Sequence, residues 1–157
     1  MYTLHAVTVT DAQSADLGEI EGLLTLSGLS PEGVAESLAG FVVALENGRL
    51  VATAGLEEHG AAGLLRSVAT APDRRGRGLA QRLVGTLLER ARSREYDAVY
   101  LLTSGAEAYF ERFGFRRIDR QAVPSGVRGA GQFTNQTCAS SAVMVLELNP
   151  RAIEKEA

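Results

Sequence analysis

The strongest constraint on the fold is an Asn-Gly pair between two apolar runs, in the segment FVVALENGRLVATAGLEE at residues 41–58. Asn47 and Gly48 both tolerate the positive φ that two-residue hairpin turns require. The runs on either side are apolar and rich in valine, as strands are. The sequence therefore predicts a β-hairpin over Phe41–Glu58.

The segments around this hairpin predict alternating strands and helices. A third apolar run is ended by Pro72, and the leucines that follow recur with helical spacing. Two segments, 10–13 and 104–107, have the spacing of a capping box at a helix start. The expected elements are a strand at 4–9, helices at 10–27 and 30–40, the hairpin, a strand at 62–71, a helix at 79–95, a strand at 98–103, a helix at 104–114, and strands at 115–119 and 142–148, with a Gly-rich connection at 125–131.

This order predicts an α/β fold in which helices cover a mixed sheet. The chain has 157 residues, 45% of them hydrophobic and 22% charged, which suits one globular domain. We expect that domain to cover residues 1–149, with a tail at 150–157.

Charge and cysteine content exclude several classes of partner. A net charge of −3 argues against nucleic acid and anionic membranes, which select basic surfaces. Cys138, His5 and His59 lack metal-ligand spacing, so no metal is expected. With neither a signal-type segment nor an apolar run long enough to span a membrane, the sequence predicts a cytoplasmic protein.

The segment PDRRGRGLAQRL, residues 72–83, carries the strongest chemical signal. A dinucleotide fingerprint would need a third glycine at Gln81, and a P-loop would need Gly-Lys-Ser/Thr, so neither motif fits. What remains is a helix start without a capping side chain, preceded by Gly76 and Gly78. Its N–H groups and helix dipole suit an anion such as pyrophosphate, with Arg74, Arg75, Arg77 and Gln81 at the rim. A solvated basic turn is the alternative.

Two motifs resemble the GNAT family of N-acetyltransferases. RGRGLA at 75–80 resembles the family's Arg/Gln-x-x-Gly-x-Gly/Ala motif, and AYFERFGFRRI at 108–118 its second signature. Three segments, GLLRSVATAP, YLLTSGAEAYFERFGFRRIDRQAVP and CASSAVM, are most similar to arsenic-resistance N-acetyltransferases and more distantly to N-acetylglutamate synthases. The resemblance implies a twisted mixed sheet of about seven strands with a splayed central pair and about four flanking helices.

The resemblance also implies acetyl-CoA as co-substrate and a primary amine as acceptor. Residues 68–70 match the segment that binds the pantetheine arm, and residues 76–81 match the pyrophosphate loop. The implied cofactor contacts are Val68, Ala69, Thr70, Arg75, Gly76, Arg77, Gly78, Leu79, Ala80, Gln81, Thr103 and Phe110.

Two positions depart from the family pattern. Many members have a tyrosine where this chain has Phe110, and an asparagine where it has Thr103. Tyr109, one residue earlier, is the remaining candidate for protonating the leaving thiolate. A non-catalytic acyl-CoA-binding domain therefore stays open as an alternative to an enzyme.

Several charged and polar residues are candidates for the acceptor side. Glu57, with Glu58 second, is the candidate general base, a solvated strand end being the alternative. Arg66 interrupts an apolar strand and needs an anion, either a substrate carboxylate or an internal partner. The resemblance implies an amino-acid-like acceptor, with glutamate and arsenical analogues among the alternatives. Ser141, Arg128 and Arg120 are further candidates for binding it, and a homodimer is left open.

Overall fold

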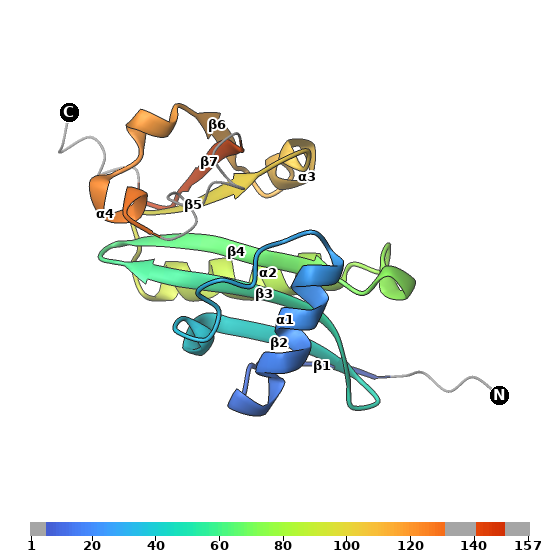
Figure 1. Cartoon of the computed structure of the whole chain (residues 1–157). Helices are drawn as coiled ribbons and strands as arrows, with labels where there is room; N and C mark the ends of the chain where they lie inside the picture. Colours follow the sequence, from blue (N-terminus) through green and yellow to red (C-terminus); the bar gives the residue numbers. More distant parts are fainter. Residues whose placement is uncertain (1–5, 131–140, 150–157) are drawn as a thin grey trace. The chain divides into compact units, whose positions relative to one another are not determined.

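The computed structural model describes residues 6–130 and 141–149. Their strands form a seven-stranded mixed sheet in the order β1-β2-β3-β4-β5-β7-β6, which confirms the predicted class of fold (Figure 1). The chain divides into two compact units. Unit 1 comprises Met1–Leu56 and Ser67–Leu87, and unit 2 comprises Glu57–Arg66 and Leu88–Ala157. Each unit is described by itself.

The strands of unit 1 are built around the predicted hairpin. β1 (Val7–Asp11) pairs antiparallel with β2 (Phe41–Glu46), which pairs antiparallel with β3 (Arg49–His59). Asn47 and Gly48 have φ values of 53° and 77°, as the turn requires. The hairpin prediction is therefore confirmed.

Two glycines of unit 1 are required by close contacts. Gly55 pairs with Phe41, and a Cβ at Gly55 would lie 2.5 Å from the Phe41 ring. A Cβ at Gly40 would lie 2.1 Å from the backbone oxygen of Leu56. Real Cβ atoms do not approach other atoms this closely, so both positions need glycine.

The first helix of unit 1 begins later than its predicted capping box. Thr10 and Asp11 belong to β1, because they pair with Val43 and Val42. A short 3₁₀ turn, η1 (Ser14–Asp16), leads instead into α1 (Leu17–Leu26), and the Gln13 N–H donates to Asp16 Oδ2 at 2.7 Å. The prediction of a cap at Thr10 is therefore wrong.

The predicted second helix, 30–40, is also wrong. This stretch consists of turns followed by the 3₁₀ helix η2 (Leu38–Gly40). Gly33 has a φ of 82°, which a right-handed helix cannot contain. Ser30 Oγ accepts a hydrogen bond from the Glu32 N–H at 3.1 Å, so it stabilises a turn.

The remaining elements of unit 1 lead to the glycine-rich motif. They are the end of β4 (Ala62–Thr70), the 3₁₀ turn η3 (Pro72–Arg74) and the first part of α2 (Leu79–Ser93). The Ala71 N–H donates to the Val51 oxygen at 2.8 Å and ties the end of this segment to β3. The predicted apolar stripe of α2 is buried, at Leu79, Leu83, Val84 and Leu87 in unit 1 and at Leu88 and Ala91 in unit 2.

Unit 2 holds the other end of the sheet. The start of β4 pairs in parallel with β5 (Ala98–Thr103), from Ala62–Ala98 to Leu65–Leu101. β7 (Ala142–Glu147) lies between β5 and β6 (Arg116–Ile118) and is antiparallel to both. The strand bounds predicted for β5 are those observed.

The helices of unit 2 are short. They are α3 (Glu107–Glu111), the 3₁₀ turn η4 (Arg120–Ala122) and α4 (Ser125–Arg128), the last lying where a Gly-rich connection was expected. The predicted cap at Ser104 is wrong, because the residue before α3 is Ala106. A buried apolar cluster joins β4, β5 and β7 to the segment that contains α4; its members are Leu64, Ala98, Tyr100, Val123, Val127, Ala130, Val143 and Val145.

Some predictions concern residues outside the described part of the chain. These are the start of the first strand, His5, Cys138 and the tail at 150–157. The single-domain boundary at residue 149 stays a prediction. Among the described residues, none of the helices has the length and hydropathy that a membrane span needs.

Candidate functional site

The glycine-rich motif in unit 1 exposes backbone to solvent. Gly76 and Gly78 have φ values of 80° and 76°, a left-handed conformation that L side chains rarely adopt. A Cβ at either position would have no atom within 4 Å, so the space beside this backbone is open. The loop can therefore receive a ligand against its main chain.

Helix α2 begins directly after this loop. Its first intrahelical bond runs from the Arg82 N–H to the Gly78 oxygen at 3.1 Å. The N–H groups of Leu79, Ala80 and Gln81 come before that bond and have no acceptor one turn earlier within the helix. The first turn of α2, all of it described, contains no acidic residue. These features make the helix start suitable for an anion.

The three arginines of the motif differ in their contacts. Arg75 and Arg77 are exposed, and Arg75 Nε donates to the Thr70 oxygen at 3.3 Å. Arg74 donates instead through Nε to Glu46 Oε2 at 2.9 Å, and its Nη1 lies 3.1 Å from Asp73 Oδ2. The expected position of Arg74 at the rim of an anion site is therefore corrected: its guanidinium binds protein carboxylates.

A second ion pair lies beside that of Arg74. Arg49 donates through Nη1 and Nη2 to the two carboxylate oxygens of Asp73, both at 2.9 Å. This bidentate bond from Arg49 lowers the pKa of Asp73 from its ordinary 3.8 to about 2. The turn of the β2–β3 hairpin is thus joined to the residues just before the glycine-rich loop.

The segment predicted to bind pantetheine, Val68–Thr70, is the end of β4. Ala69 is buried, whereas Val68 and Thr70 are half-buried. Just before it, the buried Ser67 has a φ of 59°. A non-glycine residue in this region carries backbone strain, which is commonly found near functional sites.

The acceptor-side candidates Glu57 and Arg66 meet in unit 2. Arg66 Nη1 lies 2.7 Å from Glu57 Oε2, and the two side chains are 2% and 11% exposed. His59 Nε2 lies 3.0 Å from Glu57 Oε1. The Glu57 carboxylate therefore contacts a guanidinium through one oxygen and an imidazole through the other.

The contacts of this cluster bear on the alternatives that the sequence left open for Glu57, Glu58 and Arg66. Glu57 is largely buried and Glu58 is exposed, so the solvated strand end describes Glu58. Arg66 has an internal anionic partner. Sequence reasoning considered His59 only as a metal ligand and missed its contact with Glu57, although residues two apart on a strand share a face.

Tyr109, the candidate acid, lies on α3 in a group of aromatic rings. Its ring is 5.1 Å from that of Phe110 and 5.5 Å from that of Phe113, both edge-on. Its hydroxyl is buried and has no hydrogen-bond partner among the described residues. Burial raises the pKa of Tyr109, with a smaller opposing effect from Arg112. Phe110, an expected cofactor contact, is itself only 7% exposed.

The remaining candidates in unit 2 form one small group and one isolated residue. Ser141 Oγ lies 3.0 Å from Ser104 Oγ, and the Ser141 oxygen accepts a hydrogen bond from Arg120 Nη2 at 3.2 Å. Thr103, an expected cofactor contact, is the last residue of β5 and is buried. Arg128 is exposed on α4.

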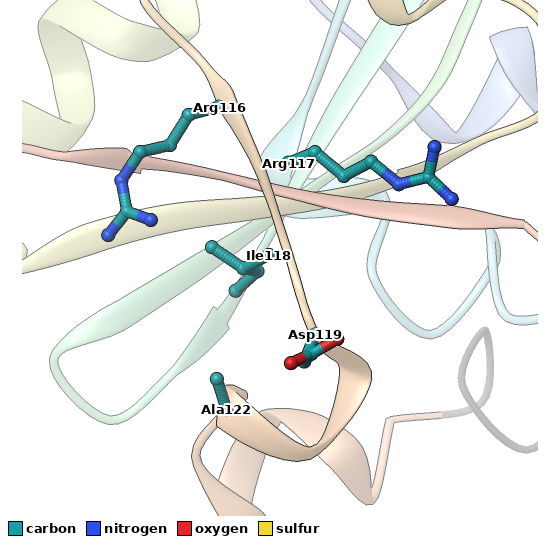
Figure 2. A pocket seen from close by; sticks show the side chains of 5 residues that line it. All are labelled: Arg116, Arg117, Ile118, Asp119 and Ala122. Carbon is teal, nitrogen blue, oxygen red and sulfur yellow. The ribbon is translucent and has the colours of Figure 1, made fainter.

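A cavity of about 520 Å³ lies beside β6. It is lined by Arg116, Arg117, Ile118, Asp119 and Ala122, and Figure 2 shows the two arginine side chains leaving the strand on opposite sides. Arg116 forms an ion pair with Glu147. None of the predicted site residues lines this cavity, so it does not mark the predicted site. Across residues 6–130 and 141–149, His, Cys, Asp and Glu side chains form no cluster suited to a metal ion.

Comparison with protein families identifies a match over most of the chain. The family model described as "Acetyltransferase (GNAT) family" matches residues 12–115, which include β2 to β5 and the glycine-rich loop. Among curated proteins, none matches the sequence.

Solved structures show the same fold. The Mycobacterium tuberculosis protein Rv2747, in complex with CoA and NLQ, has a TM-score of 0.77 at 23% identity; the match covers 90% of this chain and 99% of that one. N-acetylglutamate synthase from Neisseria gonorrhoeae, complexed with coenzyme A and N-acetyl-glutamate, has a TM-score of 0.78 at 21% identity. That match covers 92% of this chain and 35% of the synthase. The ribosomal-protein-S18-alanine N-acetyltransferase of Escherichia coli has a TM-score of 0.71 at 18% identity, covering 92% and 95%.

Proposed function

This chain belongs to the acetyltransferase (GNAT) family, and on that premise we propose that it transfers the acetyl group of acetyl-CoA to the primary amine of a small amino acid or amino-acid analogue. The observation that carries the proposal is the helix start after Gly76 and Gly78, with its left-handed glycines and open space beside the backbone. The CoA present in the structures of Rv2747 and of the Neisseria synthase supports the same co-substrate.

The residues of the loop fit a pyrophosphate. Backbone N–H groups over 76–81 would donate to its oxygens, and glycine lets the phosphates approach the main chain closely. Arg75 and Arg77 are exposed and would add positive charge. The end of β4 at Val68–Thr70 would bind the pantetheine arm through its backbone.

Acetyl-CoA supplies an acyl thioester: a bond forms between the amine nitrogen and the carbonyl carbon, the bond to sulfur breaks, and the thiolate takes up a proton. The amine must lose a proton for attack, and Glu57 is the proposed acceptor of it, directly or through water. Its two carboxylate oxygens together have about four lone-pair sites. The contacts to Arg66 and His59 use one on each oxygen, so a site remains on each for a proton.

Tyr109 is the proposed donor to the leaving thiolate. A tyrosine phenol is protonated at neutral pH, as an acid requires, and burial raises the pKa of Tyr109 further. Its hydroxyl is also a buried donor without a partner among the described residues, and such groups call for an explanation. Proton donation during the reaction would provide one.

An amino-acid-like acceptor needs contacts for its anionic group. Arg66 already has Glu57 as a partner, which favours a role in holding the base over one in binding a substrate carboxylate. Ser141, Arg120 and Arg128 are then the proposed contacts for an anionic group of the acceptor. Glutamate and an arsenical amino acid are the alternatives that the sequence resemblance suggests.

A second function, acyl-CoA binding without catalysis, is favoured by one observation. Phe110 stands where many family members have tyrosine, and it is packed against other aromatic rings. This alternative predicts CoA binding with no acetyl transfer to any amine.

One experiment tests both functions. CoA binding would be measured by calorimetry, and thiol release from acetyl-CoA would be followed across a panel of amines that includes glutamate, other amino acids, and organoarsenical and phosphinic analogues. We expect micromolar binding and thiol release with at least one amino-acid-like acceptor. Binding without release across the panel would support the non-catalytic alternative, and no binding would contradict both.

A further inference from the structure

Four charged residues join the β2–β3 hairpin to the segment that leads into the glycine-rich loop, and we name them the hairpin–loop cluster: Glu46, Arg49, Asp73 and Arg74. We propose that Glu46 and Arg49 are positioning residues for the phosphate-binding loop and thereby determine its affinity for CoA. This inference rests on the proposed function and adds residues that neither the loop motif nor the acceptor candidates include.

The hairpin side of the cluster has a fixed geometry. Glu46 is the last residue of β2, Arg49 is the first of β3, and the two are paired in register across the Asn47–Gly48 turn. Antiparallel pairing fixes the backbone of both residues. Their side chains therefore start from a rigid base.

The loop side consists of two consecutive residues. Asp73 and Arg74 are the last residues of η3, and Arg75 and Gly76 follow directly. Arg49 binds Asp73 through two bonds of 2.9 Å, and Glu46 binds Arg74 through one of 2.9 Å. Two neighbouring points of the chain are thus attached to the hairpin just before the backbone turns left-handed at Gly76.

The two pairs differ in burial and contribute in different ways. Arg74 and Glu46 have side chains that are 24% and 5% exposed, so their pair is largely shielded from water. Arg49 and Asp73 are 50% and 53% exposed, and exposed pairs of this kind add little to stability. We therefore expect a change of Arg49 to weaken CoA binding without lowering the free energy of unfolding.

Charge compensation is a second consequence of the cluster. Asp73 would place a negative charge three residues before Gly76, where it would repel phosphates. Arg49 compensates this charge together with Arg74, which also pairs with Asp73, and Glu46 in turn binds Arg74. The cluster contains two acids and two bases, so it orients the loop while adding no net charge. The positive charge facing a phosphate then comes from the α2 start, Arg75 and Arg77.

The test uses Arg49→Gln and Glu46→Ala, with Arg92→Gln as matched control. Arg92 also has a side chain that is 50% exposed and pairs with an exposed carboxylate, Glu89 at 3.6 Å, but it belongs to the part of α2 in unit 2 and is not a member of the cluster. CoA affinity would be measured by calorimetry. Kinetics would be compared for acetyl-CoA and for S-acetylpantetheine, a thioester without phosphates.

We expect Arg49→Gln to weaken CoA binding about fivefold and Glu46→Ala about tenfold or more, corresponding to roughly 1 kcal/mol and above. Both variants should keep the wild-type kcat/KM for S-acetylpantetheine, because that substrate does not use the phosphate loop. Arg92→Gln should match wild type in every measurement. In Arg49→Gln/Asp73→Asn, which also removes the negative charge that Arg49 helps to compensate, CoA should bind more tightly than in Arg49→Gln.

Wild-type protein that binds CoA, with both single variants within twofold of it, would overturn the inference while leaving the proposed function intact. Equal losses with acetyl-CoA and S-acetylpantetheine would also overturn it, because they would indicate general damage to the fold. Wild-type protein that does not bind CoA would instead refute the proposed function.

Discussion

Arg66 and Glu57 lie on the two strands of the β3–β4 hairpin and are joined by an ion pair of 2.7 Å whose members are 2% and 11% exposed. A guanidinium this deeply buried is stable only with its anion in place. The same carboxylate contacts His59 at 3.0 Å. Glu57 is therefore held in one orientation by two neighbours, as a base that acts on a bound substrate must be.

Arg66→Ala should lower the free energy of unfolding by about 3–5 kcal/mol, because it leaves a buried carboxylate without its partner. Urea denaturation measures the change. The double variant Glu57→Gln/Arg66→Met, which removes both charges, should be less destabilised than Arg66→Ala. In Arg66→Lys, KM would be measured for an amino acid and for its carboxamide. If the ratio of the two KM values differs from that of the wild type, Arg66 binds the acceptor.

Gly78→Asp should abolish CoA binding measured by calorimetry. Gly78 has a φ of 76°, so aspartate would strain the backbone and place a like charge beside the phosphates. Gly85→Asp is the matched control, because Gly85 is exposed on α2, the helix that follows Gly78, and has no atom within 4 Å of its Cβ position. Unchanged affinity in Gly78→Asp would place the phosphates elsewhere.

Asp73 should titrate with a pKa of about 2, because Arg49 donates two hydrogen bonds to its carboxylate. The folded pKa lies below the unfolded value. The stabilisation from this group is therefore present above about pH 4 and is lost as the pH falls towards 2. Carboxyl NMR titration checks the value, and in Arg49→Gln the midpoint should rise towards about 4. A midpoint near 4 in wild type would contradict the pair.

The Tyr109 phenol should titrate above its ordinary pKa of 10.0, because burial disfavours the phenolate. Its contribution to stability is present below the unfolded pKa and is lost as the pH rises through the folded one. Because Tyr109 is the proposed acid, Tyr109→Phe should lower kcat by about a hundredfold. Tyr96→Phe is the control, since Tyr96 is also buried with a raised pKa but is outside the proposed site. Equal kcat values in both variants would exclude Tyr109.

Gly40→Ala should destabilise unit 1 by about 2 kcal/mol or more, because its Cβ would lie 2.1 Å from the Leu56 backbone oxygen and force the backbone to shift. Gly22→Ala on α1 has nothing within 4 Å and should stabilise the protein by about 0.5–1 kcal/mol. Thermal unfolding of the two variants compares them directly. Equal midpoints would show that the hairpin can relax around Gly40.

Features that depend on neighbouring residues could be predicted from the sequence. The Asn47–Gly48 turn needs positive φ at two adjacent positions, and the strand at Ala98–Thr103 is a continuous apolar run; both were found as predicted. Both capping predictions failed because partners distant in sequence took the same residues. Thr10 pairs with Val43 in the sheet, and the Ser104 hydroxyl contacts Ser141, 37 residues later.

In the candidate site, too, local features could be predicted from the sequence, whereas contacts between distant residues could not. The glycines of the loop are visible in the motif, and their backbone conformation agrees with it. The partner of Arg74 is Glu46, 28 residues earlier, and no local pattern identifies it. The sequence required an anion near Arg66 but left two sources open, and only the structure shows Glu57 in contact with it.

The position of β7 has a consequence for synthesis of the chain. β7 pairs with β5 on one side and β6 on the other, yet at Ala142–Glu147 it leaves the ribosome after the other strands that the structure describes. Until it emerges, β5 and β6 lack the partner that joins them, and exposed strand edges are prone to intermolecular pairing. We therefore expect a nascent chain stalled before Ala142 to stay sensitive to protease in unit 2 and to aggregate on release. Synthesis of β7, which pairs residues up to 49 positions apart (Ala98 with Glu147), would end the period in which these edges are exposed.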